Sequence, residues 1–317
     1  MTIALVLILG ALLVAWAAPR LLEYRLHTGA DPQTLLVTWI AVVGGTLLSL
    51  TAAASLVLLP GHGPTRHVMT LVHHCWAAVS HGSVPRFHEV AALLSVVLLA
   101  IAVMRCSGGV FRHAQQRRTL HRKHLDLVRI LTGGGTTPGS TLWLDVPHPM
   151  AYSVAGRPAL VVATEGLRRQ LPRDAVAAVL EHERAHIRGR HHLMVAIAEG
   201  LAAALPWLPL MRRSPHLVRT LVEVSADSVA ARSHSPGAVR AALLGMSASS
   251  APAHALGMAP DCIALRLAAL SSNRPEHSRL RRALHSGLAG TIAAFVPALA
   301  SVAFLAAGIL MSCPILS

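Results

Sequence analysis

Two histidines and a glutamate form the sequence H-E-R-A-H from His182 to His186. Pro172 and Asp174 stand just upstream, as is typical of the first turn of a helix. Four residues along a helix turn by about 400°, so both histidines lie on one face, one turn apart. Two imidazoles placed in this way can bind one Zn²⁺. Glu183 lies beside them and can act as the general base on the attacking water.

A catalytic zinc site needs a third protein ligand and keeps one position open. Glu223 lies downstream in a stretch with helical character and is the obvious donor. Asp227, one turn later, can accept the second N–H of a ligand histidine and fix its tautomer. His234 is a candidate for stabilising the oxyanion of the tetrahedral intermediate, with an ordinary surface histidine as the alternative.

The apolar stretch from Leu193 to Leu210 separates the two motifs and has the composition of a membrane span. A single crossing there would put Glu223 on the opposite side of the membrane from His182. Basic residues flank both ends, and the stretch contains a glutamate and two prolines, so it has no polarity for one crossing. We expect a buried or membrane-leaning helix, with a helical hairpin that enters and returns as the alternative.

Residues 149–163 alternate small and β-branched side chains around Gly156-Arg157-Pro158, which predicts two short strands and a turn. In a zinc peptidase the edge of such a sheet can bind an extended substrate through main-chain hydrogen bonds. A sheet that only packs against the core is the alternative.

Long uncharged runs set the fold class. Only 13% of the 317 residues are charged and 53% are hydrophobic, which disfavours an ordinary soluble enzyme. We predict three transmembrane helices within residues 1–104, at about 2–18, 34–59 and 88–106, and a fourth within 286–317, which ends in a short outer tail. The first run could instead be a cleaved signal peptide, but it lacks a basic start and a retained helix is favoured.

The basic residues orient these helices. The chain has 27 Arg and one Lys, and 23 Arg with Lys123 fall in residues 105–285. Under the positive-inside rule this segment is a cytosolic domain, both termini are outside, and residues 61–88 form an outer loop. That loop holds six histidines, which could bind metal or simply be polar. The excess charge is explained by topology and anionic lipid, so we expect no direct contact with nucleic acid.

The order of these motifs resembles the BlaR/MecR-type regulatory membrane metallopeptidases. The resemblance rests on Ala151–Gly156, Leu180–Ile187, Pro206–Pro209 and the pair Glu223 and Asp227, and covers most of the chain. It implies a gluzincin-like site in which His182, His186 and Glu223 bind Zn²⁺ and Glu183 is catalytic. The expected fold is therefore a mainly α polytopic membrane protein with a cytosolic α+β zincin-like metallopeptidase insert.

The resemblance also implies partners. The expected substrate is a BlaI/MecI-like repressor, with self-cleavage as a further implication, and the sequence leaves a homodimer open. The HtpX and CAAX-protease group shares both motifs, so a quality-control protease in the cell membrane is the alternative. A non-catalytic membrane receptor with a vestigial site is a third reading.

Three departures from the family pattern stand out. Arg184 puts a charge where zincin helices usually carry a neutral residue, and His191 stands where the family commonly has Asp. The chain also has no S-x-x-K, since its only lysine, Lys123, follows Leu120 by three positions. We therefore expect no acylation by a β-lactam through the family's sensor chemistry.

Overall fold

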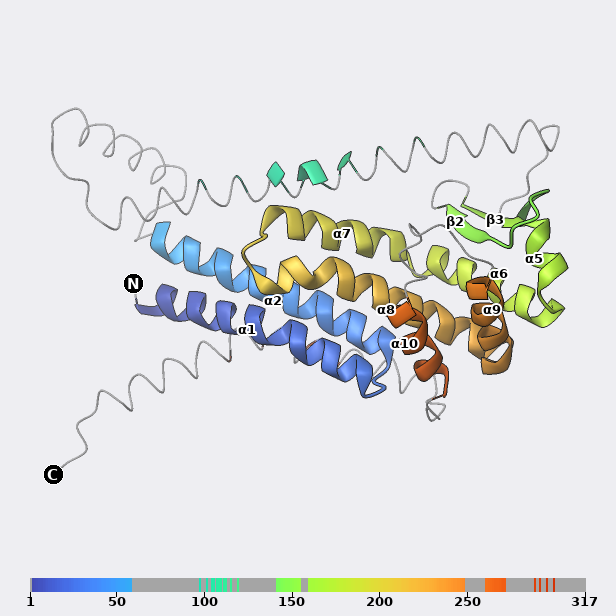
Figure 1. Cartoon of the computed structure of the whole chain (residues 1–317). Helices are drawn as coiled ribbons and strands as arrows, with labels where there is room; N and C mark the ends of the chain where they lie inside the picture. Colours follow the sequence, from blue (N-terminus) through green and yellow to red (C-terminus); the bar gives the residue numbers. More distant parts are fainter. Residues whose placement is uncertain are drawn as a thin grey trace, which may run out of the picture.

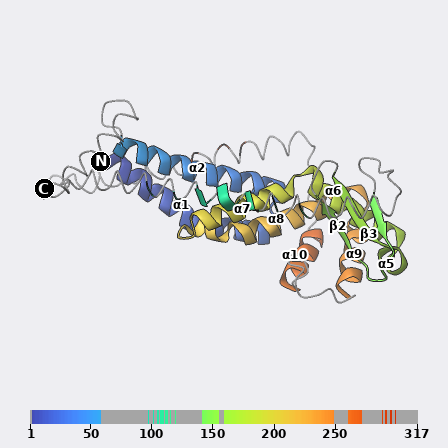
Figure 2. The same ribbon diagram turned by 90° about the horizontal axis from the view of Figure 1, so that it is seen from above.

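The computed structural model describes residues 2–58, 141–154, 159–248 and 260–271, with isolated helical positions within 97–119 and 288–299. The described part is mostly helical. Four long helices run side by side, and a small sheet with shorter helices lies at one end of them (Figures 1 and 2). The elements, in chain order, are α1 (Thr2–His27), α2 (Pro32–Leu58), β1 (Thr141–Leu144), β2 (Ala151–Val154), β3 (Leu160–Thr164), α5 (Glu165–Gln170), α6 (Arg173–Arg188), α7 (His191–Ala204), α8 (Pro209–Ser233), α9 (Pro236–Ala248) and α10 (Pro260–Ser271).

Helices α1 and α2 form an antiparallel hairpin. The turn between them contains Gly29, at a positive φ of 83°, and Asp31 caps α2 by accepting a hydrogen bond from the Thr34 N–H at 2.9 Å. Helix α1 continues through Pro19 for about two turns beyond the predicted span at about 2–18. Packing explains the continuation, since Leu22 and Leu26 are both buried in the bundle core.

Two stretches of this hairpin are long and apolar enough to cross a membrane, Leu5–His27 and Pro32–Ala54. The predicted spans at about 88–106 and 286–317 fall largely outside the described residues, as do the loop 61–88 and the turn 156–158.

Helices α7 and α8 form a second hairpin. Most of the apolar stretch 193–210 is the single helix α7, as expected, and a hairpin that enters the membrane and returns stays a prediction. Pro206 lies in the turn and Pro209 begins α8, where a missing N–H costs nothing. The hairpin packs along α1 and α2, and its turn points away from the sheet (Figure 1). Trp39 of α2 donates a hydrogen bond to the Ser214 hydroxyl of α8 at 2.8 Å, and both side chains are buried.

The sheet has the strand order β1-β3-β2, with β1 parallel and β2 antiparallel to β3. The predicted strand pair corresponds to β2 and β3, whereas β1 was not predicted. Every residue of β3 is buried, while β2 lies at an edge. Helix α6 packs against β2, β3 and α8, and this places the H-E-R-A-H sequence between the edge strand and the second hairpin.

Candidate metal centre

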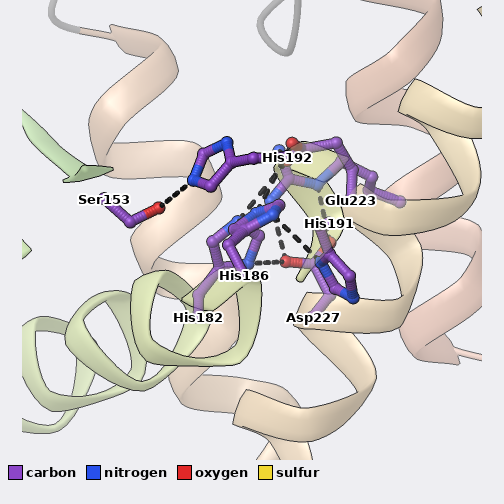
Figure 3. A network of polar contacts seen from close by, with 8 residues as sticks. Ser153, His182, His186, His191, His192, Glu223 and Asp227 are labelled. Carbon is purple, nitrogen blue, oxygen red and sulfur yellow. Dashed lines mark hydrogen bonds and ion pairs between the residues drawn. The ribbon is translucent and has the colours of Figure 1, made fainter. Parts of the chain in front are cut away.

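Helices α6 and α8 bring the three predicted ligands together. The Nε2 atoms of His182 and His186 lie 3.0 Å apart, and the carboxylate of Glu223 lies 3.4 Å from the first and 3.6 Å from the second. One ligand atom from each residue lies within 4.8 Å of the others, and Figure 3 shows the side chains pointing toward one another. Two imidazole nitrogens and a carboxylate are a donor set that fits catalytic Zn²⁺ and leaves a fourth position open.

Asp227 lies where a residue that orients a ligand should lie. Its Oδ1 is 2.8 Å from Nδ1 of His182, and the carboxylate is buried, with 2% of the residue exposed. Nδ1–H of His182 can therefore donate to Asp227 while Nε2 points at Glu223 and His186. This arrangement selects the tautomer that a metal needs.

A buried arginine that was not predicted from the sequence pairs with both acidic residues of the site. Arg266 of α10 donates to both carboxylate oxygens of Asp227, at 2.6 and 2.7 Å, and its Nη1 lies 3.2 Å from Glu223. Arg266 is the only charged residue between Cys262 and Leu270. A lone arginine in an apolar helical stretch is a sequence signal for a buried ion pair, although it does not identify the partner.

His191 is the second residue whose role in the structure we had not predicted. It is buried and its Nδ1 lies 3.0 Å from Nδ1 of His186. The sharp turn between α6 and α7 makes this contact, with Arg190 at a positive φ of 50°. His186 is thus oriented by an imidazole, whereas His182 is oriented by a carboxylate.

Glu183 lies between the ligand pair and the edge strand. Burial raises the pKa of its carboxyl group, against the lowering effects of nearby His182 and of hydrogen bonds from Ser153 of β2. The Ser153 hydroxyl also lies 3.3 Å from Nε2 of His192 (Figure 3). A raised pKa in a confined site suits a group that accepts and returns protons.

In the absence of metal His182 is protonated, His186 is neutral and Glu223 is ionised. Burial lowers the pKa of His182, but hydrogen bonds and charges of Asp227 and Glu223 outweigh it and raise the pKa to about 10. Burial and the neighbouring charge of His182 lower the pKa of His186 to about 3. Burial opposes ionisation of Glu223, yet its hydrogen bond with His182 and nearby cations lower its pKa to about 2. Metal binding must therefore displace the proton of His182.

His234 is not part of this network. It follows the last residue of α8, its side chain is exposed, and it lies two helical turns beyond Asp227. Within the described residues no contact joins it to the site. His192 lies closer to the site, because its Nε2 is 3.3 Å from the hydroxyl of Ser153, which also hydrogen-bonds to Glu183.

Part of this region is similar to known proteins. The family described as "Peptidase family M48" matches residues 114–212, roughly a third of the chain, which includes H-E-R-A-H but stops short of Glu223. The "Protease HtpX homolog" of Pelotomaculum thermopropionicum is 39% identical over 83 residues, which are 25% of this chain and 30% of that protein. No solved structure matches the chain.

The aligned segment thus spans less than a third of the curated relative. Together with the two apolar helices α1 and α2, this relative indicates a membrane protein. Neither comparison confirms the BlaR/MecR-type subfamily that the order of motifs resembles. What they support, in agreement with the His-His-Glu geometry, is the M48 metallopeptidase family.

Proposed function

We propose that this protein is a membrane-embedded, zinc-dependent endopeptidase. The observation that carries the proposal is the convergence of His182, His186 and Glu223 beside Glu183, at the edge of the sheet. M48 peptidases are typically zinc-dependent, which agrees with this donor set.

Each residue of the site would have a separate role in peptide hydrolysis. His182, His186 and Glu223 would hold the metal, which polarises the scissile carbonyl when bound. Glu183 would take a proton from the attacking water and pass it to the leaving amine. Asp227 and His191 would keep the two ligand imidazoles in the required tautomers. Strand β2 lies at the edge of the described sheet, next to the base, where an extended substrate would add as a further strand through main-chain hydrogen bonds.

Two substrate classes follow from two different observations. Similarity to a protease HtpX homologue favours the quality-control alternative, and the substrates that we propose for this alternative are damaged membrane proteins. The order of motifs supports cleavage of one cytosolic regulator, such as a BlaI/MecI-like repressor, or of the chain itself. Both require the domain to face the cytosol, which the arginine distribution supports.

Replacing the base tests the mechanism. We expect Glu183→Gln to retain near-stoichiometric zinc and to lose proteolysis, because the carboxylate moves protons but does not hold the metal. Purified protein in detergent or lipid would be assayed for metal by elemental analysis and for cleavage of an unfolded protein. An active Glu183→Gln variant would overturn the mechanism, and wild-type protein without zinc would support the non-catalytic receptor. Comparing the cleaved proteins in cells with and without the active enzyme then separates one regulator from many membrane fragments.

A further inference from the structure

The charges of the four long helices are sorted along the bundle. Residues 2–19, 32–58 and 200–211 contain no Asp, Glu, Lys or Arg, and the last of these is the end of the α7–α8 hairpin. Charges begin at Arg20 on α1 and at Arg212 on α8. Two contacts show that these positions lie at the same height along the bundle axis. Arg213 lies 3.9 Å from Glu23, and Trp39 donates a hydrogen bond to Ser214.

Helix lengths favour a membrane boundary at this level. At 1.5 Å per residue, the 26 residues of α1 are about 39 Å long, more than the roughly 30 Å of a hydrocarbon core. Residues 2–19 measure about 27 Å, and the part of α2 beyond Trp39 measures about 28 Å. The uncharged part of α1 therefore matches the bilayer, as does the part of α2 beyond Trp39, and the remaining turns of both helices extend past it.

Aromatic and basic residues gather at the same level. The guanidinium of Arg20 lies 4.2 Å from the ring centroid of Trp16, which is 54% exposed. Arg105, just after the third apolar run, donates to the carbonyl of Ala203 at 3.0 Å, at the end of α7. Trp207, in the turn between α7 and α8, is 60% exposed. Tryptophan and arginine together are typical of the lipid headgroup region.

We propose that the bilayer surface crosses the bundle at Arg20, Arg105 and Arg212. The turn around Trp207 then dips into the lipid without crossing it, while both hairpins continue out of the membrane as one packed stalk. Glu223 follows Arg212 by eleven residues of one helix, so the stalk holds the metal centre about 16 Å from the boundary.

The distance of the metal centre from the membrane surface limits which substrates can reach it. This inference rests on the proposed function. A polypeptide anchored in the same bilayer must extend about 16 Å to reach Glu183, and an extended chain covers about 3.3 Å per residue. The protease therefore cuts exposed segments that lie at least about five residues from a membrane anchor. It does not cut bonds next to the anchor or within the bilayer.

Cysteine labelling tests the boundary independently of proteolysis. In a chain whose four cysteines are changed to serine and whose Glu183 is changed to Gln, single cysteines replace Trp207 or His216, which is exposed on α8 beyond the boundary. Proteoliposomes are treated with a membrane-impermeant maleimide, with the same protein in detergent as the reference for full labelling. We expect His216→Cys to be labelled in vesicles and Trp207→Cys to be labelled only in detergent.

Two results would overturn the boundary. Equal labelling of both positions in vesicles would mean that the turn lies in water, and protection of both would mean that the stalk itself is in the membrane. A second measurement does not depend on cysteine at the turn: brominated lipids should quench the fluorescence of wild-type protein more than that of Trp207→Phe.

Anchored substrates then test the height. One cleavable sequence is placed two, five, eight or fifteen residues from a transmembrane anchor, and each is mixed with active enzyme in vesicles. Cleavage should be lost at two residues and present from about five onward. Equal cleavage of all four substrates would overturn the height, whereas no cleavage of any of them, or of the soluble sequence, would overturn the proposed function instead.

Discussion

His191 contacts His186 through their Nδ1 atoms, which lie 3.0 Å apart in a buried contact. If Nε2 of His186 binds the metal, its Nδ1 carries the hydrogen and His191 is the acceptor. The other ligand, His182, donates instead to the carboxylate of Asp227. A carboxylate makes the imidazole that donates to it more basic, and a neutral ring does so less. The imidazole of His182 is therefore made more basic by its acceptor than the imidazole of His186.

We predict that His191→Asp tightens zinc binding and that His191→Ala weakens it. The carboxylate restores an anionic acceptor for His186, while alanine removes the acceptor, and such changes alter metal affinity by about 10- to 100-fold. Competition against a zinc-binding dye measures both. His216→Asp, which makes the same change at an exposed position of α8, is the control and should leave the affinity unchanged. A His191→Asp protein that binds zinc no more tightly than wild type would contradict the role.

The same contact can be disturbed without changing either histidine. A Cβ atom at Gly189 would lie 2.4 Å from Nε2 of His191, so Gly189→Ala must displace that ring. The backbone there has a φ of −77°, which alanine adopts freely, so the effect comes from the displacement alone. We expect Gly189→Ala to weaken zinc binding in the otherwise wild-type protein. In a protein that already carries His191→Ala, it should not lower the zinc affinity further. Gly237→Ala, where the nearest atom is 3.8 Å away, is the matched control.

The sequence predicted the residues that do chemistry better than the elements that support them. Helical spacing was enough to put His182 and His186 on one face, and Asp227 one turn from Glu223. Arg266 lies alone in an apolar helical stretch, which indicates a buried ion pair, but its partners Asp227 and Glu223 are 39 and 43 residues away, so only the fold identifies them. The length of α1 beyond the predicted span was not foreseen, because Pro19 and Arg20 end the uncharged run, whereas the buried contacts of Leu22 and Leu26 with the bundle extend the helix to His27.

Removing Arg266 should destabilise the protein strongly. Arg266→Met removes one of the two cations, beside protonated His182, that pair with the buried Asp227 and the partly buried Glu223, and such a loss typically costs up to about 3–5 kcal/mol of unfolding free energy. Denaturant unfolding of the zinc-free protein in detergent measures it. Arg169→Met, which breaks an exposed pair with Asp145, should cost less than about 1 kcal/mol.

Two further measurements separate the role of the ion pair from packing. Zinc should reduce the loss in Arg266→Met, because the metal would itself balance the charge of Glu223. The double variant with Asp227→Asn should lose less than the sum of the two single variants, since it removes a charge that the first change leaves unpaired. Additive losses, together with no effect of zinc, would mean that Arg266 acts only by filling space.

The zinc-free protein should be most stable near pH 6.5, because its buried histidines titrate in opposite directions. The pKa of His182 rises to about 10 on folding, so its contribution is complete below 6.5 and is lost as the pH climbs toward 10. Burial and neighbouring histidines lower the pKa of His191 to about 4 and that of His186 to about 3. Their contribution is complete above 6.5 and is lost as the pH falls toward those values.

Unfolding free energies measured from pH 4 to pH 10, with a chelator present, test this profile. His182→Gln should remove most of the alkaline decline, because the group that loses a proton there is gone. Zinc should also reduce the loss of unfolding free energy at alkaline pH, since metal binding releases the same proton from the folded state. A stability that keeps rising above pH 8 in the zinc-free wild type would show that His182 is not held protonated by Asp227 and Glu223.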